Sequence, residues 1–226
     1  MTLYYQDETV TLYHGDCVGE HREWTAADVL VTDPPYGVAF QSGMRKGERL
    51  ATIANDGSAA VRDAVVAEWG AGRPGIVFGS WRVPPPAGER QRLIWAKEGT
   101  PGMGDLRMPW GTSHEDVHIL GTGWSREVAG VSRRGSVIRT TGARGGAAGE
   151  ENRWGHPTPK PVSLMELLIA ACPPGVIAEP FAGSGATIVA ARNLGRRVIA
   201  VELEERYCEV IAKRLDQGAL DLGSIA

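Results

Sequence analysis

The sequence predicts an α/β fold with a doubly wound, mostly parallel sheet and a small loop-rich insertion. Apolar runs of strand length recur without the alternation of a half-exposed strand, which is typical of strands buried on both faces. Segments with apolar residues at helical spacing lie between these runs, and this order favours a parallel sheet covered by helices. We expect strands at 29–31, 76–78, 93–95, 117–120, 176–178 and 198–201, and helices at 58–69, 162–172, 184–194 and 204–215.

The length of 226 residues suits one α/β domain with an insertion, so we expect residues 1–226 to form a single domain. Residues 124–153 differ from the rest because they are rich in Gly, Arg, Ser and Thr and contain one apolar pair, Val137-Ile138. We therefore expect a protruding, loop-rich insertion there. Residues 40–55 form a second polar stretch.

The composition excludes several classes of protein. No stretch approaches the roughly 18 consecutive apolar residues of a membrane span, and the first residues lack the features of a signal peptide. The three cysteines are far apart, which predicts reduced thiols in a cytoplasmic protein and neither a disulfide framework nor a zinc site. The five histidines lack metal-ligand spacing, so we expect no metal centre. The net charge of −3 still leaves a locally basic nucleic-acid surface open.

The segment Thr32-Asp33-Pro34-Pro35-Tyr36-Gly37 directly follows the predicted strand at 29–31. Because the carboxyl ends of parallel strands face the ligand crevice, it should project into a site. An exocyclic amino group of a base is a poor nucleophile, and acceptors such as the Asp33 carboxylate and the Pro34 carbonyl would stabilise the charge that develops when it is methylated. Pro35 stiffens the turn, and Tyr36 offers a face for a flipped base. A stiff loop without chemistry is the alternative.

Residues 176–187 predict a nucleoside-binding turn, because a buried strand runs into Glu179-Pro180-Phe181-Ala182-Gly183-Ser184-Gly185 and then into a helix. Glycines there let the backbone approach a ligand and leave helix N-terminal N–H groups free. Glu202 ends the next strand, where an acidic residue binds ribose hydroxyls in nucleoside-binding βαβ units. A helix N-terminal charge is the alternative for Glu202.

A third motif, His156-Pro157-Thr158-Pro159-Lys160-Pro161, opens the predicted helix at 162–172. A lysine and a hydroxyl fixed by flanking prolines could hold a carboxylate. A proline-rich helix entrance without a ligand is the alternative.

Together these motifs resemble the β class of amino-methylating DNA methyltransferases. In that family an Asp-Pro-Pro-Tyr loop precedes a His-Pro-Thr-x-Lys-Pro segment, and a strand with Asp-Pro-Phe-x-Gly-Ser-Gly and a later acidic residue come last. This order is a circular permutation of the usual methyltransferase order, and the chain keeps it from Gly15 to Tyr207. The resemblance omits about 97–153 and includes Tyr13-His14-Gly15-Asp16-Cys17.

The resemblance implies a Rossmann-like enzyme that transfers a methyl group from S-adenosylmethionine to N6 of adenine in double-stranded DNA, and it leaves a homodimer open. It assigns Asp33, Pro34, Pro35 and Tyr36 to the target base. Glu202 would bind the ribose of the cofactor, and Thr158 and Lys160 would lie near its methionine carboxylate. The full implied cofactor set is Asp16, Thr158, Lys160, Glu179, Phe181, Gly183, Ser184, Gly185 and Glu202.

The chain departs from the family in three places. Glu179 replaces the usual Asp, Ala186 replaces a frequent Thr, and Pro159 replaces a common Gln. None of these lies in the Asp-Pro-Pro-Tyr loop.

Three other activities stay open. Cytosine N4 poses the same chemical problem as adenine N6, although the family tends to carry Ser for cytosine where this chain has Asp33. An RNA or a protein methyltransferase could use a similar loop, but protein-glutamine methylating enzymes usually carry Asn-Pro-Pro-Tyr and the unpermuted order. The sequence predicts neither the recognition site nor a restriction partner.

Residues 126–149 contain five arginines against one glutamate. Basic side chains bind phosphates and guanine edges, and the resembled family keeps its variable recognition region here. We therefore expect a DNA target-recognition segment at 124–153, with a solvated loop as the alternative. The predicted DNA contacts are Arg133, Arg134, Arg139 and Arg144.

Overall fold

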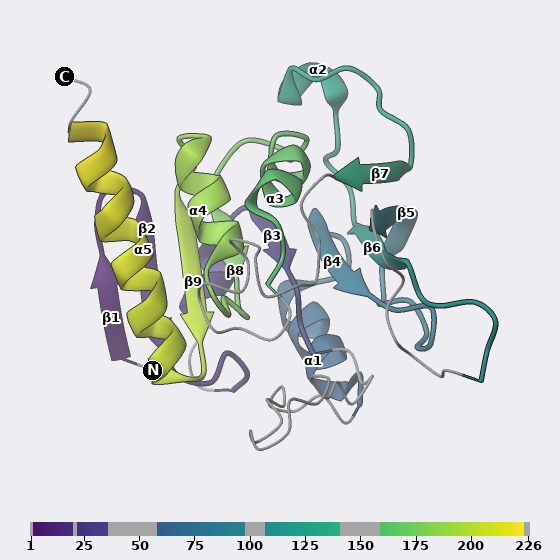
Figure 1. Cartoon of the computed structure of the whole chain (residues 1–226), viewed down its shortest axis with the longest axis horizontal. Helices are drawn as coiled ribbons and strands as arrows, with labels where there is room; N and C mark the ends of the chain where they lie inside the picture. The colour runs from purple at the N-terminus through teal and green to yellow at the C-terminus, as the bar shows by residue number, and fades with distance from the viewer. Residues whose placement is uncertain (1, 20–21, 36–57, 98–106, 141–158, 224–226) are drawn as a thin grey trace.

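The computed structural model describes residues 2–19, 22–35, 58–97, 107–140 and 159–223, the last six of these as backbone only. The described residues form a nine-stranded sheet in the order β1-β2-β9-β8-β3-β4-β6-β5-β7 (Figure 1). The strands are β1 Thr2–Gln6, β2 Val10–His14, β3 Val29–Thr32, β4 Gly75–Gly79, β5 Glu89–Lys97, β6 His114–Leu120, β7 Val137–Thr140, β8 Ile177–Glu179 and β9 Val198–Glu202.

The sheet has a parallel centre and mixed ends. Neighbouring strands from β2 to β4 are parallel, whereas β1 runs antiparallel to β2 and β6 runs antiparallel to both β4 and β5. The edge strand β7 is parallel to β5. The carboxyl ends of β2, β9, β8, β3, β4, β5 and β7 therefore share one edge of the sheet, together with the amino end of β6.

Helices cover both faces, as a doubly wound sheet requires. One face packs against α3 Val162–Ile169, α4 Ala186–Asn193 and α5 Glu205–Gly223. The other packs against the 3-10 turn η1 Glu23–Ala26 and α1 Ala60–Trp69, where Trp24 and Trp69 stack at 6.1 Å between ring centroids. A doubly wound, mostly parallel α/β sheet is confirmed.

The structure contains all six predicted strands and all four predicted helices, with shifts of a few residues at most ends, while α5 continues to Gly223, well beyond its expected end at 215. It also contains β1 and β2, which were not predicted from the sequence because polar residues stand at both ends of β1 and within β2. From the sequence, 93–95 and 117–120 were expected to be buried parallel strands, but β5 and β6 are antiparallel. Three consecutive exposed residues at 90–92 show that β5 lies half outside the core.

The expected insertion at 124–153 is described as far as residue 140. Ser125 caps the short helix α2 Arg126–Ala129 by accepting the Val128 N–H. The apolar pair Val137-Ile138 then begins β7, whose Ile138 side chain is buried while Val137 is exposed. This part of the segment thus extends the sheet by one edge strand.

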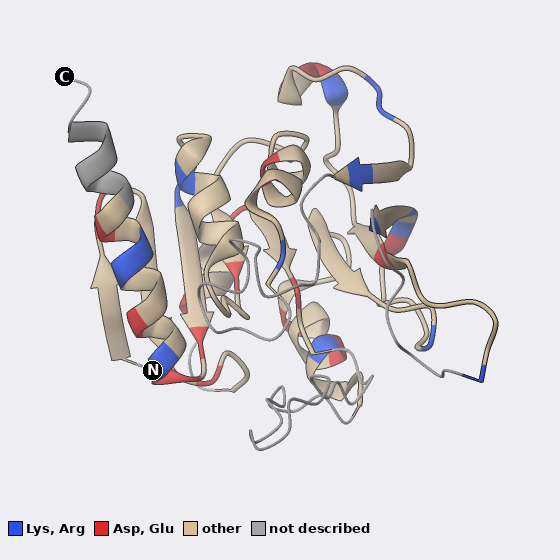
Figure 2. Cartoon of the chain, viewed as in Figure 1, with Lys and Arg blue, Asp and Glu red and all other residues tan. Residues whose placement is uncertain are grey.

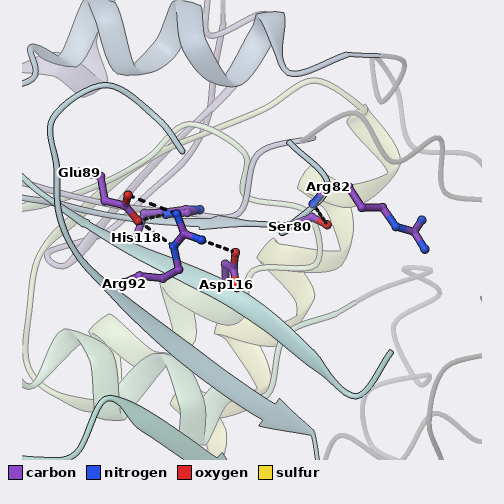
Figure 3. Close-up of polar contacts among 6 residues, drawn as sticks. All are labelled: Ser80, Arg82, Glu89, Arg92, Asp116 and His118. Carbon is purple, nitrogen blue, oxygen red and sulfur yellow. Dashed lines mark hydrogen bonds and ion pairs between the residues drawn. The ribbon is translucent and has the colours of Figure 1, made fainter. Parts of the chain in front are cut away.

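A polar cluster holds β5 to β6 on the face that α1 occupies further along the sheet (Figure 3). His118 Nδ1 lies 2.7 Å from Glu89 Oε1, and Arg92 bridges Glu89 at 3.0 Å and Asp116 at 3.5 Å. His118 leaves no room above Gly79, where a Cβ would lie 2.6 Å from His118 Nε2. Ser80 and Arg82 follow β4 nearby, with the Arg82 N–H donating to Ser80 Oγ at 3.3 Å. A side chain at position 79 would therefore crowd the imidazole of His118 where β4 passes it.

Candidate active site

The candidate site lies at the shared edge where the parallel strands end. Asp33 follows β3 directly, Glu179 ends β8 and Glu202 ends β9. Parallel pairing of β3 with β8 and of β8 with β9 brings these three carboxylates to one edge. This is the position at which open α/β sheets bind their ligands.

Asp33 belongs to a chain of alternating charges. Lys160 Nζ donates to Asp33 Oδ2 and lies 3.2 Å from Glu115 Oε2. Lys97 Nζ donates to the other oxygen of Glu115. We call Asp33, Lys160, Glu115 and Lys97 the charge chain. It joins the end of β3 to the start of β6, the end of β5 and the entrance of α3.

The two oxygens of Asp33 differ in their surroundings. Oδ2 accepts from Lys160, whereas Oδ1 is buried and has no hydrogen-bond partner among the described residues. Burial raises the pKa of Asp33 above its ordinary value, although the Lys160 ammonium acts in the opposite direction. Burial also opposes the ionisation of Glu115, but Lys160 and Lys97 outweigh it and hold the pKa of Glu115 below its ordinary value. Asp33 Oδ1 is thus a carboxylate acceptor to which no described residue donates.

Glu179 faces inward and ties three elements together. Its side chain is 1% exposed. Oε1 accepts from Thr32 Oγ1 at 2.5 Å and from Phe181 N at 3.0 Å, and Oε2 accepts from Thr187 Oγ1 at 2.6 Å. Burial raises the pKa of Glu179 to about 8 despite these donors. The position predicted to contact the cofactor therefore links β3, the glycine turn and α4.

Glu202 shapes the glycine turn. Its Oε2 accepts from Gly183 N at 2.7 Å, its Oε1 accepts from Glu204 N at 2.8 Å, and burial raises its pKa. Gly183 and Gly185 have φ values of 52° and 83°, and a Cβ on Gly185 would lie 2.9 Å from Ile211 Cγ1. A carboxylate can accept about four hydrogen bonds, so Glu202 keeps acceptor capacity for a further donor.

Asp16 lies beside Glu202 because β2 pairs with β9. The partners His14 and Glu202 are in register, and Gly15 N donates to the Glu202 carbonyl at 2.9 Å. Asp16 is exposed and accepts the Val18 N–H at 2.9 Å. The structure thus brings the predicted Asp16, Glu202 and glycine-turn residues to one end of the sheet, with Phe181 partly buried and Ser184 buried.

The prolines of the Asp-Pro-Pro-Tyr loop lie beside Asp33, as expected from the sequence. Pro34 is buried and Pro35 is half-buried beside Asp33, while Tyr36, Thr158 and Arg144 lie outside the described residues. Lys160, predicted to lie near a cofactor carboxylate, contacts Asp33 and Glu115.

The predicted DNA-binding arginines fall in two places. Arg133 and Arg134 lie between α2 and the start of β7, a segment with prominent basic colouring in Figure 2. Val128 and Ala129 of α2 line a pocket with residues at the amino ends of β8 and β9. This segment is therefore at the edge opposite Asp33. Arg139 pairs with Ala96 near the end of β5, closer to the edge that carries Asp33.

Glu115 and Lys97 were not predicted from the sequence. Each lies two residues beyond an apolar run that was predicted to be a strand, Lys97 after 93–95 and Glu115 before 117–120. That position on both runs is a signal that could have indicated them. Pairing of the two strands, which the sequence does not reveal, brings these residues together.

The described residues show no helix of sufficient length and apolar character to cross a membrane. In the same ranges no group of three or more His, Cys, Asp or Glu side chains is arranged to hold a metal ion. Cys17, Cys172 and Cys208 are unpaired and buried.

Comparison with known proteins places the chain in a family. The family described as DNA methylase, N6_N4_Mtase, matches residues 80–214. The Escherichia coli (strain K12) protein YubD, which is named as a methylase, is 30% identical over 217 residues, 89% of this chain and 88% of its own length. The type II methyltransferase M2.DpnII of Streptococcus pneumoniae is 44% identical over 63 residues, 27% of this chain and 24% of its own.

Solved structures show the same fold. The M1.HpyAVI–SAM complex has a TM-score of 0.64 at 19% identity and covers 91% of this chain and 98% of its own. The cytosine-N4-specific PvuII DNA methyltransferase has a TM-score of 0.65 at 14% identity and covers 93% and 88%. The match over more than half of the sequence, together with the carboxylates gathered at the sheet edge, shows that this chain belongs to the N6/N4 family of DNA methyltransferases.

Proposed function

We propose that the protein transfers a methyl group from S-adenosylmethionine to N6 of adenine in double-stranded DNA. The observation that carries the proposal is the Asp33 carboxylate, which has one buried oxygen, at the carboxyl edge of the sheet, that accepts from no residue in the described part of the chain. An exocyclic amino group is a donor that fits such an acceptor. Asp at this position also accompanies adenine in the resembled family.

The residues around the glycine turn fit the nucleoside part of the cofactor. Glu202 has acceptor capacity for ribose hydroxyls, and Gly183 and Gly185 let the backbone come close. Asp16 is exposed beside this turn and would serve the adenine of the cofactor. When bound, S-adenosylmethionine supplies a methyl group on a positively charged sulfur, which is already a strong donor.

Asp33 Oδ1 accepts a hydrogen bond from the target amino group and stabilises the positive charge that grows on its nitrogen. The new nitrogen–carbon bond forms as the carbon–sulfur bond breaks, and one proton leaves the nitrogen. The products are the methylated base, S-adenosylhomocysteine and a proton. Alignment and fixed charges supply the catalysis, and no covalent bond to the protein is needed.

DNA contacts are expected at the edge that carries Asp33. Trp81 follows the end of β4 and Met108 and Trp110 precede β6, so these three exposed side chains flank that edge. The Arg82 guanidinium lies 5.4 Å from the centre of the Trp81 ring. Aromatic faces stack on unpaired bases and arginines bind phosphates, which suits DNA with a flipped base.

The decisive experiment identifies the methylated base. The protein is incubated with S-adenosylmethionine and duplex DNA of mixed sequence, and the DNA is digested to nucleosides for mass spectrometry. N6-methyladenine supports the proposal, and N4-methylcytosine would establish the second candidate, for which the similar PvuII fold is an argument. Parallel reactions with RNA and protein should remain unmethylated.

A further inference from the structure

The charge chain restrains the rotation of the Asp33 carboxylate. Asp33 Oδ2 is held by Lys160 Nζ, and Oδ1 remains for the target base. A carboxylate held at one oxygen has its other oxygen fixed in direction. Because misplacement of a reacting group by about 1 Å can cost about 100-fold in rate, such fixation matters for catalysis.

Lys160 is itself held on several sides. Its side chain is 7% exposed, and its ammonium lies 4.9 Å from the centre of the Phe78 ring. Pro159 and Pro161 flank it, and Pro161 adopts an extended conformation as the N-cap of α3. The backbone at Lys160 is therefore stiff, and its long side chain is packed along most of its length.

Glu115 completes the balance of charge. It lies between Lys160 and Lys97, so two carboxylates alternate with two ammonium groups. Lys97 in turn lies 5.0 Å from the centre of the Trp95 ring, and Trp95 Nε1 donates to Thr140 Oγ1 at 3.0 Å. Buried charges are tolerated when each has an opposite partner, and removal of one partner leaves the next uncompensated.

We propose that Lys160 is a positioning residue for methyl transfer, which orients Asp33 through Oδ2 and keeps it ionised, and that Glu115 holds Lys160 in place. The inference rests on the proposed role of Asp33 in accepting the target amino group. Lys160 then acts on the base through Asp33 and is not needed for binding of the cofactor.

Lys160 and Glu115 act on the pKa of Asp33 in opposite directions. The charged groups that influence Asp33 are Lys160, Lys97 and Glu115 of the charge chain and Glu179 of β8. Lys160 lowers the pKa of Asp33 and Glu115 raises it. Transfer requires ionised Asp33, so the rate rises with pH as Asp33 loses its proton. Removal of Lys160 should shift this rise to higher pH, and neutralisation of Glu115 should shift it to lower pH.

The test compares Lys160→Met, Lys160→Arg and Glu115→Gln with the wild type across pH. Lys213→Met is the matched control, because Lys213 pairs with Glu209 on the exposed face of α5. Single-turnover methylation gives the rate, calorimetry gives the cofactor Kd, and 2-aminopurine fluorescence reports insertion of the target base. Wild-type protein that leaves DNA unmethylated would reject the proposed function itself, before any variant is compared.

We expect Lys160→Met to lower the rate by about 100-fold at neutral pH, the effect of a misplaced catalytic group. Its cofactor Kd should stay within about threefold of the wild type, a change of less than about 0.7 kcal/mol. Lys160→Arg should restore part of the rate, and Lys213→Met should match the wild type.

Two results would overturn the inference. Weakened cofactor binding by Lys160→Met with an unshifted pH profile would place Lys160 at the cofactor carboxylate. Equal pH profiles for Glu115→Gln and the wild type would show that the charge chain does not control Asp33. If Lys160→Met fails to fold, Lys160→Arg and Glu115→Gln still decide the question through their pH profiles.

Discussion

Thr32 Oγ1 donates to Glu179 Oε1 at 2.5 Å and thereby joins the end of β3 to the end of β8 beneath the candidate site. Because Glu179 is buried, its pKa is raised to about 8 in the folded protein against an ordinary value near 4.5. A carboxyl group with a raised folded pKa favours folding when protonated. Its contribution is therefore full below about pH 4.5 and is lost as pH rises through about 8.

Glu179→Gln should remove the pH dependence that Glu179 gives to the stability of the protein. The free energy of unfolding of the variant relative to the wild type should increase steadily between about pH 5 and pH 8, by about 1.4 kcal/mol for each pH unit. Urea unfolding at several pH values measures the difference, in which the titration of other groups largely cancels. A difference that is constant across this range would show that Glu179 titrates normally.

Asp33→Ala should abolish methyl transfer with little change in cofactor binding, because Asp33 is expected to act on the target amino group. Mutant kinetics and calorimetry test the two parts separately. Retention of more than about a tenth of kcat, a barrier change below roughly 1.4 kcal/mol, would remove Asp33 from this role.

Glu202→Ala should weaken binding of S-adenosylmethionine by about 1–3 kcal/mol, the usual cost of losing a charged hydrogen-bond partner. DNA binding in the absence of cofactor should be unchanged. Glu205→Ala is the control, because Glu205 is an exposed acidic residue in the first turn of α5. Equal cofactor affinity in both variants would make Glu202 a structural cap of the glycine turn.

Arg139 and Arg133 should differ in their effect on DNA binding, because they lie toward opposite edges of the sheet. Arg139→Ala should lower affinity, and the salt dependence should lose about one unit of slope if the contact is to phosphate. Arg133→Ala should leave both quantities unchanged. Titration of labelled duplex at several salt concentrations measures both, and a larger effect from Arg133 would place DNA on the α2 side.

Gly79→Ala should destabilise the protein by about 1–3 kcal/mol, the typical cost of overpacking. The added Cβ would lie 2.6 Å from His118 Nε2 within the polar cluster of β5 and β6. Gly72→Ala provides the matched comparison, since a Cβ there meets nothing within 4 Å. Thermal unfolding of both variants should show a lower Tm for Gly79→Ala alone.

The parallel centre of the sheet was predictable because its strands are short, apolar and buried on both faces. The position of Glu202 beside the glycine turn was predictable for a similar reason, since the glycine turn and the end of the next strand are local features of the sequence. The contacts of Lys160 with Asp33 and Glu115 were not predictable from the sequence. Proximity to Asp33 depends on how α3 enters the sheet edge, and proximity to Glu115 depends on the antiparallel pairing of β4 and β6.

The sequence alone does not reveal what the side chain of Glu179 contacts. The sequence marks it as an acidic residue before a glycine turn, a position typical of ligand contact. Its side chain accepts hydrogen bonds from Thr32 and Thr187, and only the packing of β3 and α4 around it reveals these contacts. A single sequence does not reveal that this carboxylate also supports the turn from beneath.

The strand order also affects how the protein is made. Val29 of β3 pairs with Ile177 of β8, and β2 pairs with β9. Strands near the N-terminus therefore pair with strands that are synthesised much later. During synthesis from the N-terminus, β3 keeps an open edge until most of the chain has left the ribosome. Such distant pairing slows folding and exposes apolar edges to aggregation. Nascent chains shorter than about 200 residues therefore lack Glu202 and cannot complete the turn that is expected to bind the cofactor.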